Sequence, residues 1–244
     1  MTYAVALRLE RGLVFGADTR TNAGVDNIAQ FKKLQLWRRP GDRVMVLLSA
    51  GNLAVTQAIV SLLNEHLAED ADDALPTLYT APNMYRAARV VGDAVREARR
   101  IDGAALEASK LGFTANFIFG GQINGERPRL FQIYPEGNFI EASDDTPFFQ
   151  IGEHKYGKPI LDRVARADMR LGEAAKLMLL SFDSTLRSNL SVGMPLDLLI
   201  YERDTLTVTR EKRIGADDEY FRKLSSAWSD ALRQAFAKIE EFKV

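Results

Sequence analysis

The order of strand and helix patterns constrains the fold of this chain more than any other feature of its sequence. Blocks of strands alternate with pairs of helices in the order strands, two helices, strands, two helices, strands, and a last helix follows. Short turns join many of the neighbouring strands, and a sheet with an apolar face must bury that face against another layer. We therefore expect layered antiparallel sheets with the helices on the outside.

Two periodicities identify the elements. Strands show alternating apolar residues or short apolar runs, and helices show apolar residues spaced by three and four. Strands are expected at residues 3–9, 13–17, 31–37, 43–49, 113–119, 129–134, 139–142, 148–151, 196–201 and 205–209. Helices are expected at residues 53–67, 82–100, 158–167, 171–181 and 218–242.

Two of these helices carry more apolar surface than one contact with a sheet buries. The helix over residues 53–67 is apolar on more than one face, which favours burial by a sheet and a neighbouring subunit. On the helix over residues 218–242, Phe221, Trp228 and Phe242 recur at multiples of seven residues. Such a stripe is either a core seam or a surface that docks on a neighbour, and the sequence leaves both open.

Composition excludes several classes of function. The chain has 244 residues, no cysteine, two histidines and a formal net charge of −1, without a basic run. Disulfides, thiolate metal sites and a cysteine nucleophile are therefore excluded, and we expect neither a metal nor a nucleic-acid partner. No apolar run reaches the roughly 18 residues of a membrane span, and no signal-peptide pattern opens the chain. We expect a cytoplasmic protein without membrane contact.

Thr2 follows Met1 directly, and a strand begins at the next residue. Methionine aminopeptidases remove Met1 when the second residue is small, and Thr2 then carries both a hydroxyl nucleophile and a free α-amine. The pKa of an α-amine is about 7.7–8.0, so its neutral fraction can take the hydroxyl proton directly or through one water. Because many chains begin with Met-Thr, this pair needs support from other residues.

Further motifs follow in order over most of the chain. They are Thr2-Tyr3-x-Val5-Ala6-Leu7-Arg8-Leu9, Gly12-Leu13-Val14-Phe15-x-x-Asp18-x-Arg20-Thr21-Asn22-Ala23-Gly24-Val25-Asp26, Phe31-x-Lys33-Leu34, Ser49-Ala50-Gly51-Asn52-Leu53 and Leu186-Arg187-Ser188-Asn189-Leu190-Ser191-Val192-Gly193. This set resembles the N-terminal-nucleophile hydrolases of the proteasome β-subunit type. The closest resemblance is to the bacterial proteasome-like Anbu family, the ancestral β-subunit.

The resemblance implies a fold, an activity and an assembly. The fold is an α+β single domain over residues 1–244, a four-layer αββα sandwich of two antiparallel sheets flanked by helices. The activity is that of a threonine-type amide hydrolase, a self-compartmentalising peptidase that forms an acyl-enzyme on Thr2 and needs no cofactor. The partners are a peptide or protein substrate, an unidentified activator, and copies of the same chain in a stacked ring or open spiral.

The resemblance also assigns roles to single residues. Lys33 matches the lysine whose ammonium lowers the pKa of the nucleophile, and Asp18 matches the carboxylate that keeps this lysine charged and oriented. Gly51 matches the glycine whose backbone N–H binds the oxyanion, and Ser191 matches a serine near the nucleophile. Without Thr2, the ordinary interpretations would be a structural ion pair and a turn glycine.

The catalytic lysine must be chosen from two neighbours. Lys33 precedes an apolar strand residue, as the family lysine does, whereas Lys32 does not. In a strand over residues 31–37, Lys33 shares a face with Phe31 and Gln35, and Lys32 points away. Both observations favour Lys33.

The resemblance further implies a substrate site. Thr21 and Asn22 match a segment that pairs with an extended peptide through backbone hydrogen bonds. Ser49 and Leu53 match positions that line the pocket for the residue before the scissile bond.

The chain departs from the family pattern at two places. Gly152-Glu153 stands where the family has Gly-Ser, and Ser188 stands where it has the aspartate of Asp-x-x-Ser-Gly. Glu153 is either a compensating carboxylate near the amine or a residue at a helix start, where acids are favoured. Asp183 replaces the missing aspartate only if it reaches the same place.

Three alternatives differ in class. The chain is an assembly scaffold if Thr2 is vestigial, or it hydrolyses a small amide or isopeptide rather than a protein. A serine hydrolase with His154 as the base for Ser191 or Ser188 is a weaker interpretation, because the chain has no Gly-x-Ser-x-Gly elbow.

Overall fold

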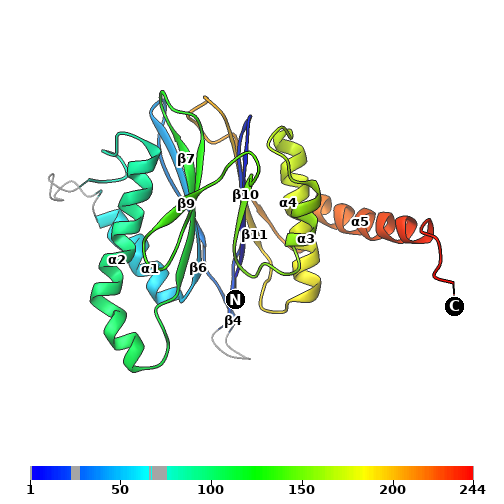
Figure 1. Cartoon of the computed structure of the whole chain (residues 1–244), viewed down its shortest axis with the longest axis horizontal. Helices are drawn as coiled ribbons and strands as arrows, with labels where there is room; N and C mark the ends of the chain where they lie inside the picture. Colours follow the sequence, from blue (N-terminus) through cyan, green and yellow to red (C-terminus); the bar gives the residue numbers. More distant parts are fainter. Residues whose placement is uncertain (1, 23–27, 66, 68–75, 244) are drawn as a thin grey trace.

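The computed structural model of the chain describes residues 2–22, 28–65, 67 and 76–243. Two antiparallel sheets face each other, one pair of helices covers each outer surface, and a last helix extends away from the body (Figure 1). This arrangement confirms the expected four-layer αββα sandwich. The single-domain organisation over residues 1–244 stays a prediction.

The first sheet holds the beginning of the chain in its interior. Its strand order is β10-β1-β2-β11-β12, and every neighbouring pair is antiparallel. The strands are β1 (Tyr3–Leu9), β2 (Gly12–Asp18), β10 (Phe148–Gly152), β11 (Leu196–Glu202) and β12 (Arg210–Ile214). Every residue of β1 and β2 is buried, because both faces of these central strands are covered by other layers.

The second sheet has the order β5-β6-β7-β8-β9 and is also antiparallel. Its strands are β5 (Leu34–Arg39), β6 (Arg43–Gly51), β7 (Ala115–Ile123), β8 (Arg129–Ile133) and β9 (Phe139–Glu141). A separate two-stranded ribbon, β3 (Arg20–Asn22) with β4 (Ile28–Gln30), connects the two sheets along the chain.

Four helices complete the outer layers, and three apolar clusters fill the spaces between the layers. The helices α1 (Leu53–Glu65) and α2 (Met84–Ala108) pack on the second sheet, and α3 (Lys158–Val164) and α4 (Leu171–Ser188) pack on the first. The third cluster lies between the sheets, where Phe15 of β2 meets residues of β6 and β7. The two sheets are therefore held face to face by a continuous core.

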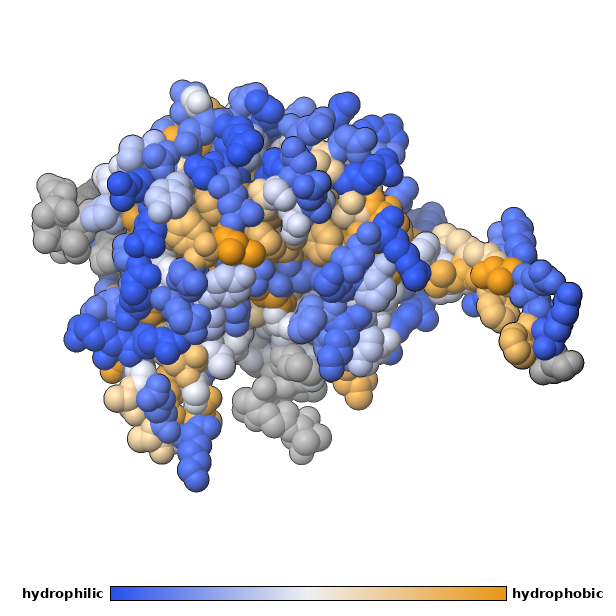
Figure 2. Space-filling view, in the orientation of Figure 1, coloured by the Kyte–Doolittle hydropathy of each residue, from blue (hydrophilic) through white to orange (hydrophobic). Residues whose placement is uncertain are grey.

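The last helix, α5 (Glu219–Ala237), packs on the body through its first turns only. Phe221 is buried and Trp228 is partly exposed, but Phe236 is 80% and Ile239 is 70% exposed. Figure 2 shows apolar surface (orange) on the projecting end of the chain. Of the two interpretations of the seven-residue stripe, a core seam is wrong for all but the start of the helix.

Several predicted boundaries are wrong. The strand expected at 31–37 is interrupted, because β4 ends at Gln30 and β5 begins at Leu34. The strand expected at 205–209 lies at 210–214 instead. The Tyr201 hydroxyl and the Gln122 side chain hold the preceding loop, in which Asp204 and Leu206 adopt positive φ.

Two helices are longer than predicted. The second helix runs to Ala108 rather than residue 100, and the fourth runs to Ser188 rather than residue 181. In the fourth helix the additional turns bury Phe182 and Thr185, so tertiary packing extends the helix beyond its local pattern.

Two features are absent from the described residues. No helix in residues 2–22, 28–65, 67 and 76–243 is both long and apolar enough to cross a membrane. Within the same part of the chain, no group of three or more His, Asp or Glu side chains is placed to hold a metal ion.

The packing of α3 predicts a clear contrast between two leucines. Leu161 of α3 is fully buried, whereas Leu111 is 66% exposed. We expect Leu161→Ala to lower the free energy of unfolding by about 2–5 kcal/mol, and Leu111→Ala to change it by about 0.5 kcal/mol or less. Urea denaturation followed by circular dichroism measures both. Similar losses for the two variants would contradict the layer assignment.

Candidate active site

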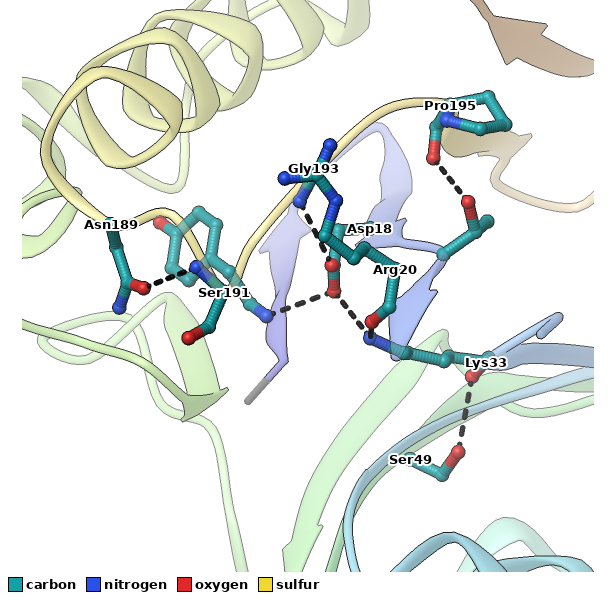
Figure 3. A network of polar contacts seen from close by, with 10 residues as sticks. Asp18, Arg20, Lys33, Ser49, Asn189, Ser191, Gly193 and Pro195 are labelled. Carbon is teal, nitrogen blue, oxygen red and sulfur yellow. Dashed lines mark hydrogen bonds and ion pairs between the residues drawn. The ribbon is translucent and has the colours of Figure 1, made fainter. Parts of the chain in front are cut away.

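Asp18 ends β2 with its carboxylate fully buried. Its Oδ1 accepts hydrogen bonds from the Tyr3 backbone N–H at 3.0 Å and from Lys33 Nζ at 2.8 Å. Its Oδ2 accepts from the Gly193 backbone N–H at 3.3 Å. Asp18 therefore joins the start of β1 to two loops that lie far away in the sequence (Figure 3).

Lys33 lies in the irregular segment between β4 and β5, and it is 4% exposed. Its Nζ donates to Asp18 and, at 2.6 Å, to the Arg20 carbonyl oxygen. Burial lowers the pKa of the Lys33 ammonium, and the Asp18 carboxylate opposes this shift. Burial likewise raises the pKa of the Asp18 carboxyl, against Lys33 and the two backbone N–H groups. The two groups form a desolvated ion pair held by hydrogen bonds on both sides.

Lys32 is not part of this pair. Its side chain is 48% exposed, and its Nζ lies 3.4 Å from Glu211. The structure pairs Lys33, not Lys32, with Asp18, and the catalytic role of Lys33 stays a prediction. The strand argument used to choose Lys33 is wrong. Phe31 is exposed while Lys33 is buried, because residues 31–33 do not form a strand.

Thr2 is buried at the start of β1, with 7% of its surface exposed. Its carbonyl oxygen accepts from the Glu153 backbone N–H at 2.6 Å. At the neighbouring Gly152 φ is +81°, and a Cβ there would overlap the Thr2 carbonyl group. A glycine is therefore required for this close approach. Together with the bond from Tyr3 N–H to Asp18, both ends of the Thr2–Tyr3 peptide group are fixed.

Glu153 makes a second set of contacts beside Thr2. Its Oε1 accepts from the backbone N–H groups of His154 at 2.8 Å and Lys155 at 2.7 Å, and its Oε2 accepts from Asn189 Nδ2 at 2.7 Å. Burial raises the pKa of this carboxyl, but the three donors outweigh burial and lower it overall. Sequence reasoning gave Asn189 no role. The only available signal was its position between Ser188 and Ser191 in the distal motif.

Ser191 lies on the same loop as Asn189 and is partly exposed. Its backbone N–H donates to Asn189 Oδ1 at 2.9 Å (Figure 3). The structure thus brings Ser191 close to Asn189 and Gly193, and through Gly193 to Asp18.

Gly51 and Ser49 lie at the end of β6, in the second sheet. At Gly51 φ is +124°, and a Cβ there would overlap the Thr114 carbonyl oxygen, so the backbone itself requires glycine. The Ser49 backbone N–H donates to the Lys33 carbonyl oxygen at 3.0 Å, which ties the lysine segment to this strand. Leu53, the first residue of α1, is partly exposed.

Thr21 and Asn22 belong to β3, where they pair with Ala29 and Ile28 of β4. The Thr21 hydroxyl is buried without a hydrogen-bond partner within the described structure. Residues Ala23 to Asp26 of the motif lie outside the described residues.

The side chains of three other candidates take no part in the contacts described above. Asp183 is buried in α4, where its carboxylate lies 3.2 Å from Arg187 Nε, and Ser188 is exposed at the end of the same helix. The His154 ring is exposed, with Nδ1 3.3 Å from the Gly152 carbonyl oxygen. The contacts among the described residues do not join His154 to Ser188.

Comparison with known proteins places the chain in a family. The family model for proteasome subunits matches residues 2–200. A Gly-1 mutant of Anbu from Hyphomicrobium sp. strain MC1 is 83% identical with a TM-score of 0.94, and the match covers 100% of both chains. The chain belongs to the Anbu family of proteasome subunits. Comparison with curated proteins gives no match.

Two more distant Anbu structures are also similar to the chain. Anbu (ancestral beta-subunit) from Yersinia bercovieri is 49% identical, with a TM-score of 0.91 and coverage of 99% of this chain and 100% of that chain. The Anbu chain in the structure "Helical Assembly of the Anbu Complex from Pseudomonas aeruginosa" is 45% identical, with a TM-score of 0.91. The match covers 99% of this chain and 98% of that chain. The roles of the single site residues stay predictions.

The buried ion pair predicts that the two adjacent lysines differ in their effect on stability. Lys33→Met should lower the free energy of unfolding by about 3–5 kcal/mol, because it leaves the Asp18 charge buried and unpaired. Lys32→Met should cost about 1 kcal/mol or less, because its ion pair is exposed. Urea denaturation of both variants measures the difference.

The double variant Asp18→Asn/Lys33→Met is the control for this interpretation. It removes both charges and should recover most of the loss. A double variant as unstable as Lys33→Met would show that lost packing, rather than an unpaired charge, causes the effect.

Proposed function

We propose that the chain is a threonine-type N-terminal-nucleophile amide hydrolase, a peptidase that acts after Met1 has been removed. The observation that carries the proposal is the position of Thr2. Its carbonyl oxygen is bound by the Glu153 N–H, and the next N–H in the chain is bound by Asp18, which is paired with Lys33. A small hydroxyl residue at the start of a central strand is thus linked through the Tyr3 N–H and the Asp18 carboxylate to a buried ammonium.

Removal of Met1 supplies the base. The freed α-amine of Thr2 takes the proton from Oγ1, directly or through one water. The Lys33 ammonium stabilises the developing alkoxide, and the Asp18 carboxylate opposes the lowering of the Lys33 pKa by burial. Because the amine and the hydroxyl belong to one residue, no histidine is needed.

The acylation step forms a bond from Thr2 Oγ1 to the substrate carbonyl carbon. Negative charge moves to the carbonyl oxygen, and the Gly51 N–H at the end of β6 donates to it. The amine passes the proton to the leaving nitrogen, and the amide C–N bond breaks. A water molecule then hydrolyses the ester and restores Thr2, so the cycle needs no cofactor.

The substrate is an extended peptide. β3 carries Thr21 and Asn22, whose backbone pairs with the added strand, and Ser49 and Leu53 line the pocket for the side chain before the scissile bond. Ser49 is bonded to the Lys33 carbonyl oxygen, which supports a pocket next to the nucleophile. A small amide or isopeptide uses the same chemistry without this backbone pairing.

The experiment that tests the proposal starts with intact mass of the purified protein, which reports whether Met1 is present. The protein is then incubated with a peptide epoxyketone, which reacts with both the hydroxyl and the free amine of an N-terminal threonine. We expect one adduct on the Thr2-initiated chain and none on Thr2→Ala. Lys33→Ala should slow labelling by about 10²-fold or more, and Lys32→Ala should leave it unchanged.

The outcomes separate the alternatives. Full peptide hydrolysis by Thr2→Ala contradicts the N-terminal-nucleophile mechanism. A Thr2-initiated chain that is not labelled favours the scaffold function. Labelling together with turnover of amino-acid amides, but not of peptides, favours the small-amide alternative.

We further propose that copies of the chain assemble through α5. A groove of about 510 Å³ lies between α3, α4 and the first half of α5, with Leu177, Leu224 and Trp228 in its lining. The occupant is the projecting end of α5 and the segment after it from a second copy, where Phe236 is 80% and Ile239 is 70% exposed. The Pseudomonas aeruginosa relative forms a helical assembly, which supports self-association in an open spiral, with a stacked ring as the alternative.

The assembly is tested by multi-angle light scattering at micromolar concentration. We expect the wild type to exceed the monomer mass of 27.2 kDa, and Phe236→Glu to reduce the mass, since a charge in an apolar groove is costly. Gln234→Glu adds the same charge next to it and should have no effect. A monomeric wild type would contradict the assembly, and a fully assembled Phe236→Glu would contradict the role of α5.

A further inference from the structure

Asn189 joins two halves of the site that no other described side chain connects directly. It is 8% exposed and follows α4, whose Thr185 carbonyl oxygen accepts its backbone N–H. The side-chain Nδ2 donates to Glu153 Oε2 at 2.7 Å, and Oδ1 accepts from the Ser191 N–H at 2.9 Å. Only one orientation of the Asn189 amide fits. A flip would place Nδ2 against the Ser191 N–H, which is also a donor, and Oδ1 against Glu153 Oε2, which is also an acceptor.

The Glu153 half holds the carbonyl end of the Thr2–Tyr3 peptide group. The Glu153 backbone N–H donates to the Thr2 carbonyl oxygen at 2.6 Å. The Glu153 side chain folds back on the next two backbone N–H groups and extends its remaining oxygen to Asn189. The end of β10 is thereby made rigid where it contacts the nucleophile residue.

The loop that follows Asn189 holds the other end of this peptide group. The Gly193 N–H donates to Asp18 Oδ2 at 3.3 Å, and Asp18 Oδ1 accepts the Tyr3 N–H at 3.0 Å. Arg20 Nη1 donates to the Leu190 carbonyl oxygen at 3.0 Å, which fixes the loop from the side of β3. The hydrogen bonds therefore form a closed ring around the Thr2–Tyr3 peptide.

We propose that Asn189 is a positioning residue for the nucleophile, acting through Glu153 on one side and through Gly193 and Asp18 on the other. The proposal rests on the proposed function, because it names the residue that holds Thr2 in place for that reaction. It also accounts for the two departures from the family pattern. Asp183 pairs with Arg187, and Ser188 is exposed. The partner of the Glu153 side chain is instead Asn189.

The first test breaks the contact with an isosteric change. Asn189→Asp keeps the acceptor for Ser191 but turns a carboxylate toward Glu153. We expect backbone hydrogen exchange, measured by mass spectrometry, to become faster by about tenfold or more in the peptides that contain Tyr3 and Gly193. The maximal rate of labelling by the epoxyketone should fall by a similar factor. The epoxyketone concentration that gives half of this rate should stay unchanged. Asn138→Asp, the same change in an exposed turn, is the matched control and should alter neither.

The second test restores the contact with the two groups exchanged. In Glu153→Gln/Asn189→Asp the new glutamine amide donates to the new carboxylate, and the other bonds keep their acceptors. We expect exchange and labelling rate to return to within about threefold of the wild type. A helix-end role of Asn189 alone would not give this recovery.

The outcomes distinguish this proposal from the proposed function. Unchanged exchange in Asn189→Asp overturns the positioning role whatever the activity. Faster exchange with an unchanged labelling rate also overturns it, because the contact would then be structural only. A wild type that is never labelled is a failure of the proposed function, and hydrogen exchange still decides whether Asn189 holds the peptide in place.

Discussion

The buried carboxylate of Asp18 is the constraint on which the rest of the site depends. An isolated charge in the interior costs several kcal/mol even after relaxation, so the fold must bring donors to it. The Tyr3 N–H, the Lys33 ammonium and the Gly193 N–H supply them from three separate parts of the chain. These segments all converge on this one desolvated charge. A buried ion pair contributes little net stability, so its value here is the position that it imposes on the start of β1.

The αββα layers explain why such a site can be both buried and open to chemistry. Central strands are enclosed on both faces, but their ends reach the edge of the sandwich. The start of β1, the end of β2 and the end of β10 are adjacent in the first sheet, so Thr2, Asp18 and Glu153 meet at one edge. The second sheet contributes the end of β6, where Ser49 is bonded to the Lys33 segment. Rigid strand ends position the residues, and short loops bring the remaining groups.

The layering of antiparallel sheets with helices outside could be predicted because it depends on local periodicity, whereas the four-layer αββα sandwich was implied by the resemblance to proteasome β-subunits. Alternation in residues 3–9 and helical spacing in residues 171–181 report which face of each element is apolar, and an apolar face must be covered. The lengths of the elements could not be predicted, because packing against other layers decides them. Helix α4 continues to Ser188 as Phe182 and Thr185 become buried, whereas α5 leaves the body after its first turns despite a regular apolar stripe. A stripe shows that a face is apolar and does not show what covers it.

The sequence by itself determined the chemical identity and order of the groups: a threonine behind Met1, an aspartate and a lysine farther along the chain, and a chain without cysteine. Only the tertiary structure decided which groups meet. It buried Lys33 rather than Lys32 through a break between two strands, and it paired Glu153 with Asn189 across 36 positions of the chain. Local patterns carry no record of such contacts, because hydrogen bonds between distant residues form only when the packing of whole layers brings their segments together.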